Sequence, residues 1–185
     1  MLSIAKNENN RIFGVRMKKK IIFVLFGLLC LFGSVFADTS FKFKLTGDGT
    51  GLCIDEYTGT DSIVFIQAYY DGMPVKEIGR EAFYCNNNIT MVSLPYTVES
   101  IGEDAFSKCK NLATINLPST IRFIGGRAFK GCTSLSEIVF DSLNYNISWG
   151  RDYFNSNAYS TFSGCSALSM SSQLRLIKMG YPDSF

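Results

Sequence analysis

The pattern of apolar and polar positions repeats nearly three times between residues 78 and 141. An Ile-Gly pair, an Ala-Phe pair and an alternating apolar run follow in this order from Ile78, Ile101 and Ile124, so successive copies start 23 residues apart. A fixed period of this length is typical of solenoid proteins, in which each copy forms one coil and buries its apolar side chains against its neighbours. We therefore expect the rest of the chain to cap, interrupt or precede a stack of coils.

One copy contains all the elements of a coil. Ile115 and Leu117 are apolar positions two residues apart, which predicts a short strand, and Pro118 ends it because proline cannot donate to a β-ladder. Residues 121–124 predict a second extended piece. The Gly-x-x-Ala-Phe segment at residues 125–129 predicts a turn followed by a short helical or 3₁₀ piece. Each coil should therefore carry its strand and a short helical piece on opposite sides.

The flanking segments have the patterns of end caps. Residues 41–45 alternate apolar and basic side chains, and residues 52–57 follow a Gly-rich turn, so the two segments predict a β-hairpin. Residues 63–66 predict a further strand. We interpret residues 38–77 as an N-terminal β cap, because the first coil of a solenoid needs its apolar edge covered. Residues 171–185 have apolar positions at helical spacing followed by Gly180, which predicts a C-terminal capping helix and tail.

An insertion separates the third copy from a degenerate fourth copy at residues 159–168. Residues 142–158 exceed the period by ten residues and carry several aromatic side chains among Asn, Ser and Gly, namely Tyr145, Trp149, Tyr153 and Phe154. Insertions in repeat proteins lie in loops on one face, which is often the binding face. These aromatic residues are therefore candidates for ligand binding, and the alternative is that they pack back over the enlarged coil.

The repeat resembles a known family. Residues 101–121 follow the pattern I-G-x-x-A-F-x-x-C-x-x-L-x-x-I-x-L-P-x-x-I at every position, which looks like the BspA-like leucine-rich repeat, also called the Treponema pallidum-type repeat. The third copy has Phe140 and Asp141 in place of Leu-Pro, and the first copy has Asn86 in place of the cysteine. The resemblance implies an α/β repeat solenoid in residues 78–170: a short leucine-rich-repeat array with its β-strands on the concave face, capped by the N-terminal β segment and the C-terminal helix.

Residues 17–37 have the pattern of a secretory signal peptide. Three lysines follow Met17, an uncharged apolar run fills residues 21–35, and Ala37 provides a cleavage site. We interpret residues 1–37 as this leader, with residues 1–16 upstream of the true start; the alternative is a retained transmembrane anchor, for which the apolar run is short. Six of the 18 basic and one of the 16 acidic residues lie in residues 1–37, so the remaining chain has 12 basic against 15 acidic residues and a net charge of −3. That balance predicts no nucleic-acid partner.

The chemistry-bearing residues do not form a catalytic pattern. The chain has no histidine, which excludes Ser-His and Cys-His nucleophile pairs and histidine metal sites. Cys109, Cys132 and Cys165 occupy one repeat position and should stack as buried structural thiols. The Glu103-Asp104 carboxylates should lie on a solvated side of the coils. We predict neither an enzyme nor a metal or cofactor site.

The resemblance implies a secreted or cell-surface protein that binds other proteins. Members of this family act as bacterial adhesins toward host matrix proteins such as fibronectin and fibrinogen, or toward other bacteria, and the alternative is a periplasmic or envelope interaction module without a host ligand. No membrane span is expected after cleavage of the leader. The residues expected to contact the ligand alternate with the core positions of the strands: Met91, Ser93, Thr114, Asn116, Glu137 and Val139.

Overall fold

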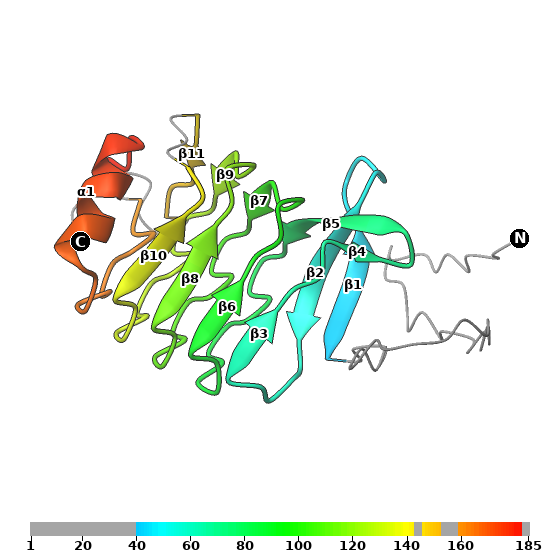
Figure 1. Ribbon diagram of the computed structural model, residues 1–185, viewed down its shortest axis with the longest axis horizontal. Helices are drawn as coiled ribbons and strands as arrows, with labels where there is room; N and C mark the ends of the chain where they lie inside the picture. The colour runs from blue at the N-terminus through cyan, green and yellow to red at the C-terminus, as the bar shows by residue number, and fades with distance from the viewer. Residues whose placement is uncertain (1–39, 143–145, 153–158, 183–185) are drawn as a thin grey trace, which may run out of the picture.

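The structure, a computed structural model, describes residues 40–142, 146–152 and 159–182, which wind into a stack of coils (Figure 1). The predicted leader at residues 1–37 lies outside the described residues. One strand of each coil enters a four-stranded parallel sheet, here called sheet B, in the order β10-β8-β6-β3. Its strands are β3 (Ile63–Phe65), β6 (Met91–Ser93), β8 (Thr114–Leu117) and β10 (Glu137–Phe140).

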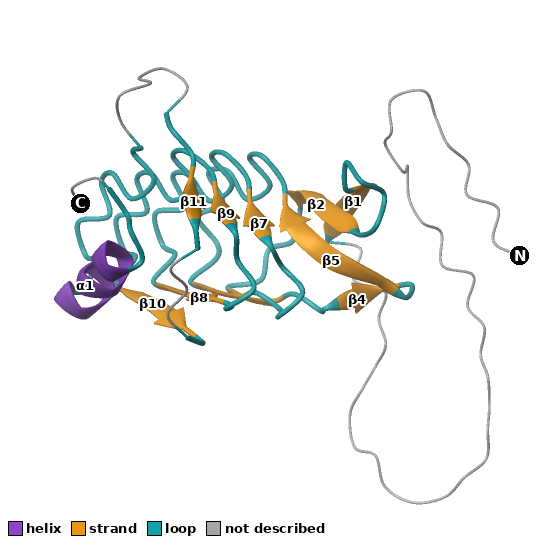
Figure 2. Ribbon diagram, turned by 90° about the horizontal axis from the view of Figure 1, so that it is seen from above, coloured by secondary structure: helices purple, strands orange, loops and turns teal. Residues whose placement is uncertain are grey.

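A second sheet, here called sheet A, runs along another side of the stack (Figure 2). It follows the order β1-β2-β5-β7-β9-β11, with β4 paired to β5. Its strands are β1 (Phe41–Leu45), β2 (Leu52–Tyr57), β4 (Tyr69–Tyr70), β5 (Met73–Ile78), β7 (Ser100–Ile101), β9 (Phe123–Ile124) and β11 (Ser148–Trp149). The predicted β1–β2 hairpin and the strands predicted near residues 63–66 and 121–124 are confirmed.

The third side of each coil differs from the prediction, because it consists of turns where short helical pieces were expected. In the first copy the Ala82 N–H donates to the Gly79 carbonyl and the Asn86 N–H to the Phe83 carbonyl. Glu81 and Cys85, at φ 59° and 58°, adopt left-handed backbone that a helix cannot continue. The intervening Phe83 N–H donates to the Ala105 carbonyl of the next coil at 2.8 Å. An amide that joins two coils in this way cannot form a helical hydrogen bond within its own coil.

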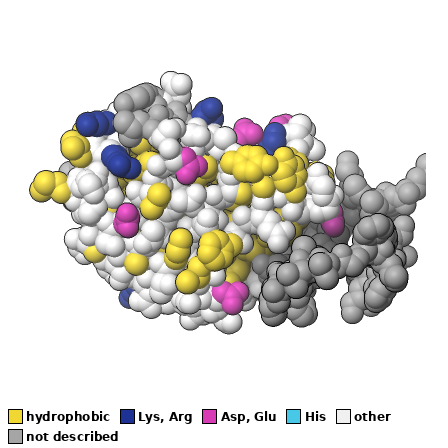
Figure 3. All heavy atoms as spheres, viewed as in Figure 1, with side chains coloured by type: hydrophobic (Ala, Val, Ile, Leu, Met, Phe, Trp, Pro, Cys, Tyr) yellow, Lys and Arg dark blue, Asp and Glu magenta, His cyan; other side chains and the backbone are white. Residues whose placement is uncertain are grey.

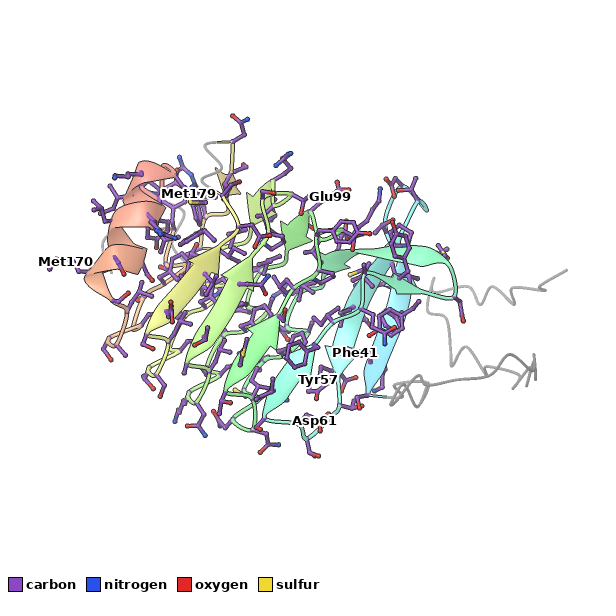
Figure 4. The ribbon with its side chains drawn as sticks, in the orientation of Figure 1. Phe41, Tyr57, Asp61, Glu99, Met170 and Met179 are labelled. Carbon is purple, nitrogen blue, oxygen red and sulfur yellow. The ribbon has the colours of Figure 1, made fainter. Side chains whose placement is uncertain are left out.

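The inward side chains of the turns form a continuous aromatic stack. Phe83, Phe106, Phe129 and Phe162 are fully buried, with successive ring centroids 4.8, 5.3 and 5.2 Å apart. Tyr57 extends the stack toward the N-terminus, where its ring packs on Phe41 at 5.0 Å (Figure 4). The Ala-Phe pair of the repeat is therefore a core signature, and it determines which side of each turn faces inward.

The stacking predicted for the repeat cysteines is confirmed. The buried thiols of Cys109, Cys132 and Cys165 donate to carbonyls of Phe83, Phe106 and Phe129 in the preceding coil, at 3.0, 3.0 and 3.2 Å. Burial raises the pKa of the Cys109 and Cys165 thiols to about 12, so both are protonated at neutral pH. In the first copy, the side chain of Asn86 accepts the backbone N–H groups of Asn88 and Ile89, and neighbouring Cys85 is exposed.

The C-terminal cap is the helix α1 (Met170–Lys178), which confirms the predicted capping helix. Ser169 caps its N-terminus by accepting the Ser172 N–H, and Gly180 follows its C-terminus with φ 82°. Leu176 and Met179 are buried against the last coil, whereas Met170 at the outer end points away from it (Figure 4). Helix α1 is the only helix among the described residues, and it is not long and apolar enough to cross a membrane.

Arg127 is buried and joins three parts of the chain, which corrects the expectation for the Glu103-Asp104 pair. Its guanidinium bonds to both carboxylate oxygens of Asp104, to Glu103 at 2.9 Å and to Asp152, beyond β11, at 2.6 Å. Asp104 is therefore buried rather than solvated. Hydrogen bonds to these carboxylates raise the pKa of the Arg127 guanidinium above its ordinary value, so the group stays charged.

Candidate binding face on sheet B

The outward side chains of sheet B form two rows across its strands. The first row runs through Ile63, Met91, Thr114 and Glu137, which are register partners. In the second row Phe65 lies opposite Ser93, and Asn116 lies opposite Val139. The residues between them, such as Val92 and Ile115, point inward and are fully buried. Sheet B thus separates a constant apolar core from a variable outer face, here called the strand face.

The structure places all six strand residues predicted from the sequence on this one face. Met91, Ser93, Thr114 and Asn116 are half-buried, whereas Glu137 and Val139 are exposed. Asn116 also joins two coils. Its side-chain carbonyl accepts the Leu94 N–H, and its amide nitrogen donates to the Leu94 carbonyl at 2.9 Å. A substitution of Asn116 would therefore disturb the contact between two coils as well as any ligand.

The aromatic residues predicted in the insertion are not gathered on the strand face. Trp149 belongs to β11 of sheet A and packs its ring on Phe162 at 6.3 Å and on Tyr181 at 5.0 Å. It is partly buried, as the packing alternative expected. Tyr145, Tyr153 and Phe154 lie outside the described residues.

Sequence reasoning missed an apolar cluster at the β3 end of the strand face. The side chains of Ile63 and Phe65 are 50% and 67% exposed, and those of Tyr69 and Tyr96, which follow β3 and β6 along the chain, are 49% and 63% exposed. A hydrogen bond with the Tyr69 hydroxyl raises the pKa of Tyr96. The alternation in residues 63–66 would have placed Ile63 and Phe65 outward, had these residues been assigned to the repeats rather than to a cap. Ile63, Phe65, Tyr69, Met91 and Tyr96 are here called the apolar cluster.

The strand face carries few charges. Of its two rows only Glu137 is ionisable. Figure 3 shows hydrophobic side chains gathered toward the β3–β6 end of this side of the molecule, with Lys and Arg side chains near its margins. A surface of this kind matches a protein interface, in which an apolar centre is surrounded by polar residues.

The described residues offer little for other kinds of chemistry. They contain no group of three or more Cys, Asp and Glu side chains that could hold a metal ion. A hollow of about 680 Å³ lies between residues 56–60 and the turns at residues 81–88. Its two carboxylates, Glu56 and Glu81, form ion pairs with Lys42 and Arg80.

Solved structures similar to this chain come from several bacteria. A T. pallidum leucine-rich repeat protein has 24% sequence identity, with 81% of this chain and 98% of that chain covered and a TM-score of 0.57, which shows the fold. A leucine-rich cell-surface protein from Faecalibacterium prausnitzii has 31% identity over 57% of this chain and 31% of its own, with a TM-score of 0.47. A Bacteroides capillosus leucine-rich repeat protein has 22% identity over 56% and 95% of the two chains, with a TM-score of 0.49.

No curated protein matches the sequence. The BspA type leucine-rich repeat region matches residues 76–180 in six copies, which is more than half of the chain. The matched range includes the repeats at Ile78, Ile101 and Ile124, the degenerate fourth copy and helix α1. Proteins built from leucine-rich repeats are typically binding modules for other proteins. The chain belongs to the BspA type leucine-rich repeat family.

Proposed function

We propose that this protein is exported and binds a protein partner through the strand face of sheet B, in adhesion to host matrix proteins or to other bacteria. The observation that carries the proposal is the apolar cluster at one end of a face whose other residues are mostly polar and weakly charged. Binding energy concentrates in a few apolar and aromatic anchors that a polar rim surrounds. Phe65 and Tyr96, each more than 60% exposed, would be such anchors.

The repeat design supports a binding role because core and surface residues are independent. Inward residues such as Val92, Ile115 and Ile138 are apolar in each coil, which holds the backbone in register. Outward residues change from Met91 to Thr114 without altering that register. Such a scaffold can acquire a ligand-specific surface without losing its core.

The size of the face predicts modest affinity for each copy of the protein. Four strands spaced about 4.8 Å apart make a surface only about 15–20 Å across. A stable protein interface buries about 800 Å² on each partner. Adhesion through this face should therefore depend on several copies acting together, since linked sites raise the effective concentration of one another.

Export is supported by the sequence of the leader. The basic start at residues 17–20 and the uncharged run at residues 21–35 follow the order of a secretory signal peptide. Protease treatment of intact cells tests the location: degradation of the folded protein would place it on the cell surface. Protection in intact cells, with loss after the outer envelope is opened, would favour the periplasmic or envelope module.

Binding to immobilised fibronectin and fibrinogen tests the adhesin proposal. The purified chain beginning at Asp38 would be assayed alone and as an artificially tethered pair. We expect dose-dependent binding that strengthens on tethering. Ser93→Arg on the strand face should weaken it, whereas Ser100→Arg, the same change on sheet A, should not. Absence of binding in both forms would contradict the adhesin proposal, and equal effects of the two variants would contradict the assignment to the strand face.

A further inference from the structure

The two edges of sheet B are treated differently by the fold. At the β10 edge, the Ile138 N–H donates to the Ser172 hydroxyl of α1 at 3.1 Å, and the Ser136 carbonyl accepts the Ser169 N–H at 2.9 Å. The capping segment thus pairs two of the backbone groups that a further strand would have bonded. Figure 1 shows α1 beside β10 at one end of the row of strands and β3 at the other end.

At the β3 edge, the backbone groups of two residues face outward from the sheet. The Ser62 carbonyl accepts the Met91 N–H, and the Ile66 N–H donates to the Ser93 carbonyl. The backbone groups of Ser62, Val64 and Ile66 therefore face β6. Because successive residues of a parallel strand point alternately to its two neighbours, the N–H and C=O groups of Ile63 and Phe65 face the free edge. Within the described part of the chain, no hydrogen bond is formed by these groups.

The β3 edge also lacks the side chains that usually protect an open strand. Natural edge strands are kept apart by charged residues, proline or a covering element. Residues 62–70 contain neither a charged residue nor a proline. By contrast, β1 at the edge of sheet A carries Lys42 and Lys44, which form ion pairs with Glu56 and Asp55 of β2. The edge that is left open is therefore also the one with exposed Ile63 and Phe65 side chains.

We propose that β3 pairs in antiparallel orientation with β3 of a second copy of this chain. A two-fold axis between the Val64 residues of the two copies places Ile63 of each copy opposite Phe65 of the other. The two residues of each such pair exchange both N–H···O=C bonds. The register is self-complementary, since the residues whose backbone groups face the edge are the ones that meet. The two copies of sheet B become one continuous sheet, and both strand faces point to the same side.

Charge and area favour a weak symmetric contact. In this register Asp61, on the loop before β3 (Figure 4), lies opposite Gln67 of the other copy, so no like charges meet across the strands. The contact joins two short strands and the flanks of their side chains, which is well below the ~800 Å² per partner of a stable complex. We therefore infer a reversible dimer that forms as protein concentration rises. It would bring the two apolar clusters together at the centre of a doubled face.

Sedimentation equilibrium of the purified chain beginning at Asp38 tests the pairing, under reducing conditions because Cys85 is exposed. Over roughly 5–500 µM, we expect the weight-average mass to rise toward that of a dimer. Phe65→Lys and Phe65→Pro should each abolish the rise, because the first places a charge opposite Ile63 of the other copy and the second removes an edge N–H. Phe123→Lys, the matched change at an exposed residue of sheet A, should leave it unchanged.

Hydrogen exchange of the Ile63 and Phe65 amides provides a second measurement. Their exchange should slow at least several-fold as the dimer forms, whereas the Val64 amide should change little because it already faces β6. A monomer at all concentrations would overturn the proposal, as would a dimer that persists in both Phe65 variants or is lost in Phe123→Lys. The result is independent of the ligand, so failure to bind matrix proteins would leave the pairing standing.

Discussion

The two ends of the coil stack differ in whether the edge backbone groups of sheet B are hydrogen-bonded. At the C-terminal end, α1 buries Leu176 and Met179 and pairs the β10 backbone through Ser169 and Ser172. At the N-terminal end, the β1–β2 hairpin extends sheet A, but the edge of β3 that faces away from β6 pairs with no other strand of the described residues. A solenoid needs its apolar ends covered, but the backbone edge of a sheet can be left open when it serves an interaction. The difference locates the surface at which this protein can meet a partner strand.

Removal of the helix contact should produce the largest change in stability. Leu176→Ala deletes a fully buried side chain from α1, and such truncations cost about 2–5 kcal/mol. Leu174→Ala on the exposed side of the same helix should cost no more than about 0.5 kcal/mol. Urea unfolding of the two variants measures the contrast, and equal losses would show that α1 does not stabilise the stack through its buried side.

Loss of the hydroxyl that pairs the β10 edge should have a smaller effect. Ser172→Ala leaves the Ile138 N–H without its acceptor, and an unsatisfied buried group costs about 1–3 kcal/mol. The Ile138 amide should also exchange faster. Ser171→Ala, an exposed neighbour, is the matched control. Unchanged exchange at Ile138 in the Ser172 variant would contradict the edge-pairing role of α1.

Alkaline pH should affect both ends alike, because each contains a buried thiol. Burial raises the pKa of Cys53 and Cys165 to about 12 from an ordinary value of 9.0, so the folded chain holds these protons more tightly than the unfolded chain. The contribution of these thiols to the free energy of unfolding is complete below about pH 9 and is lost as the pH rises toward 12. Near pH 10 the loss is about 1 kcal/mol per thiol. Unfolding of Cys53→Ala and Cys165→Ala should show a smaller loss between about pH 8 and 10. Cys85→Ala should show the full loss.

Substitution at the open edge should change stability least. Phe65→Lys alters a side chain that is 67% exposed, so the unfolding free energy of the monomer should stay within about 0.5 kcal/mol. Val64→Ala, one residue away and buried, should cost about 1–3 kcal/mol. Urea unfolding at low protein concentration measures the stability of the monomer without a contribution from self-association. A large loss in Phe65→Lys would mean that β3 is part of the core and is unavailable as an open edge.

Local pattern was sufficient to predict the repeat, its strands and its stacked cysteines, because each depends on which side of one coil is apolar. The same pattern did not predict the turns, because the Gly-x-x-Ala-Phe segment is compatible with a helix until the neighbouring coil accepts its amides, as Ala105 does for Phe83. It also placed Asp104 in solvent, although its carboxylate bonds to the buried Arg127 of the next coil, which also bonds Asp152 within the insertion.

The sequence by itself therefore determined the period, the core positions and the candidate strand face from Met91 to Val139. The tertiary structure decided that Asn116 bonds the neighbouring coil, that Trp149 packs on Phe162 and Tyr181, and that Ile63 and Phe65 form an open edge. The physical reason is that hydrophobic periodicity reports which side of a strand is buried. Whether the edge of that strand is paired depends on residues far away in the chain, such as Ser172 at one end of sheet B, and on their absence at the other.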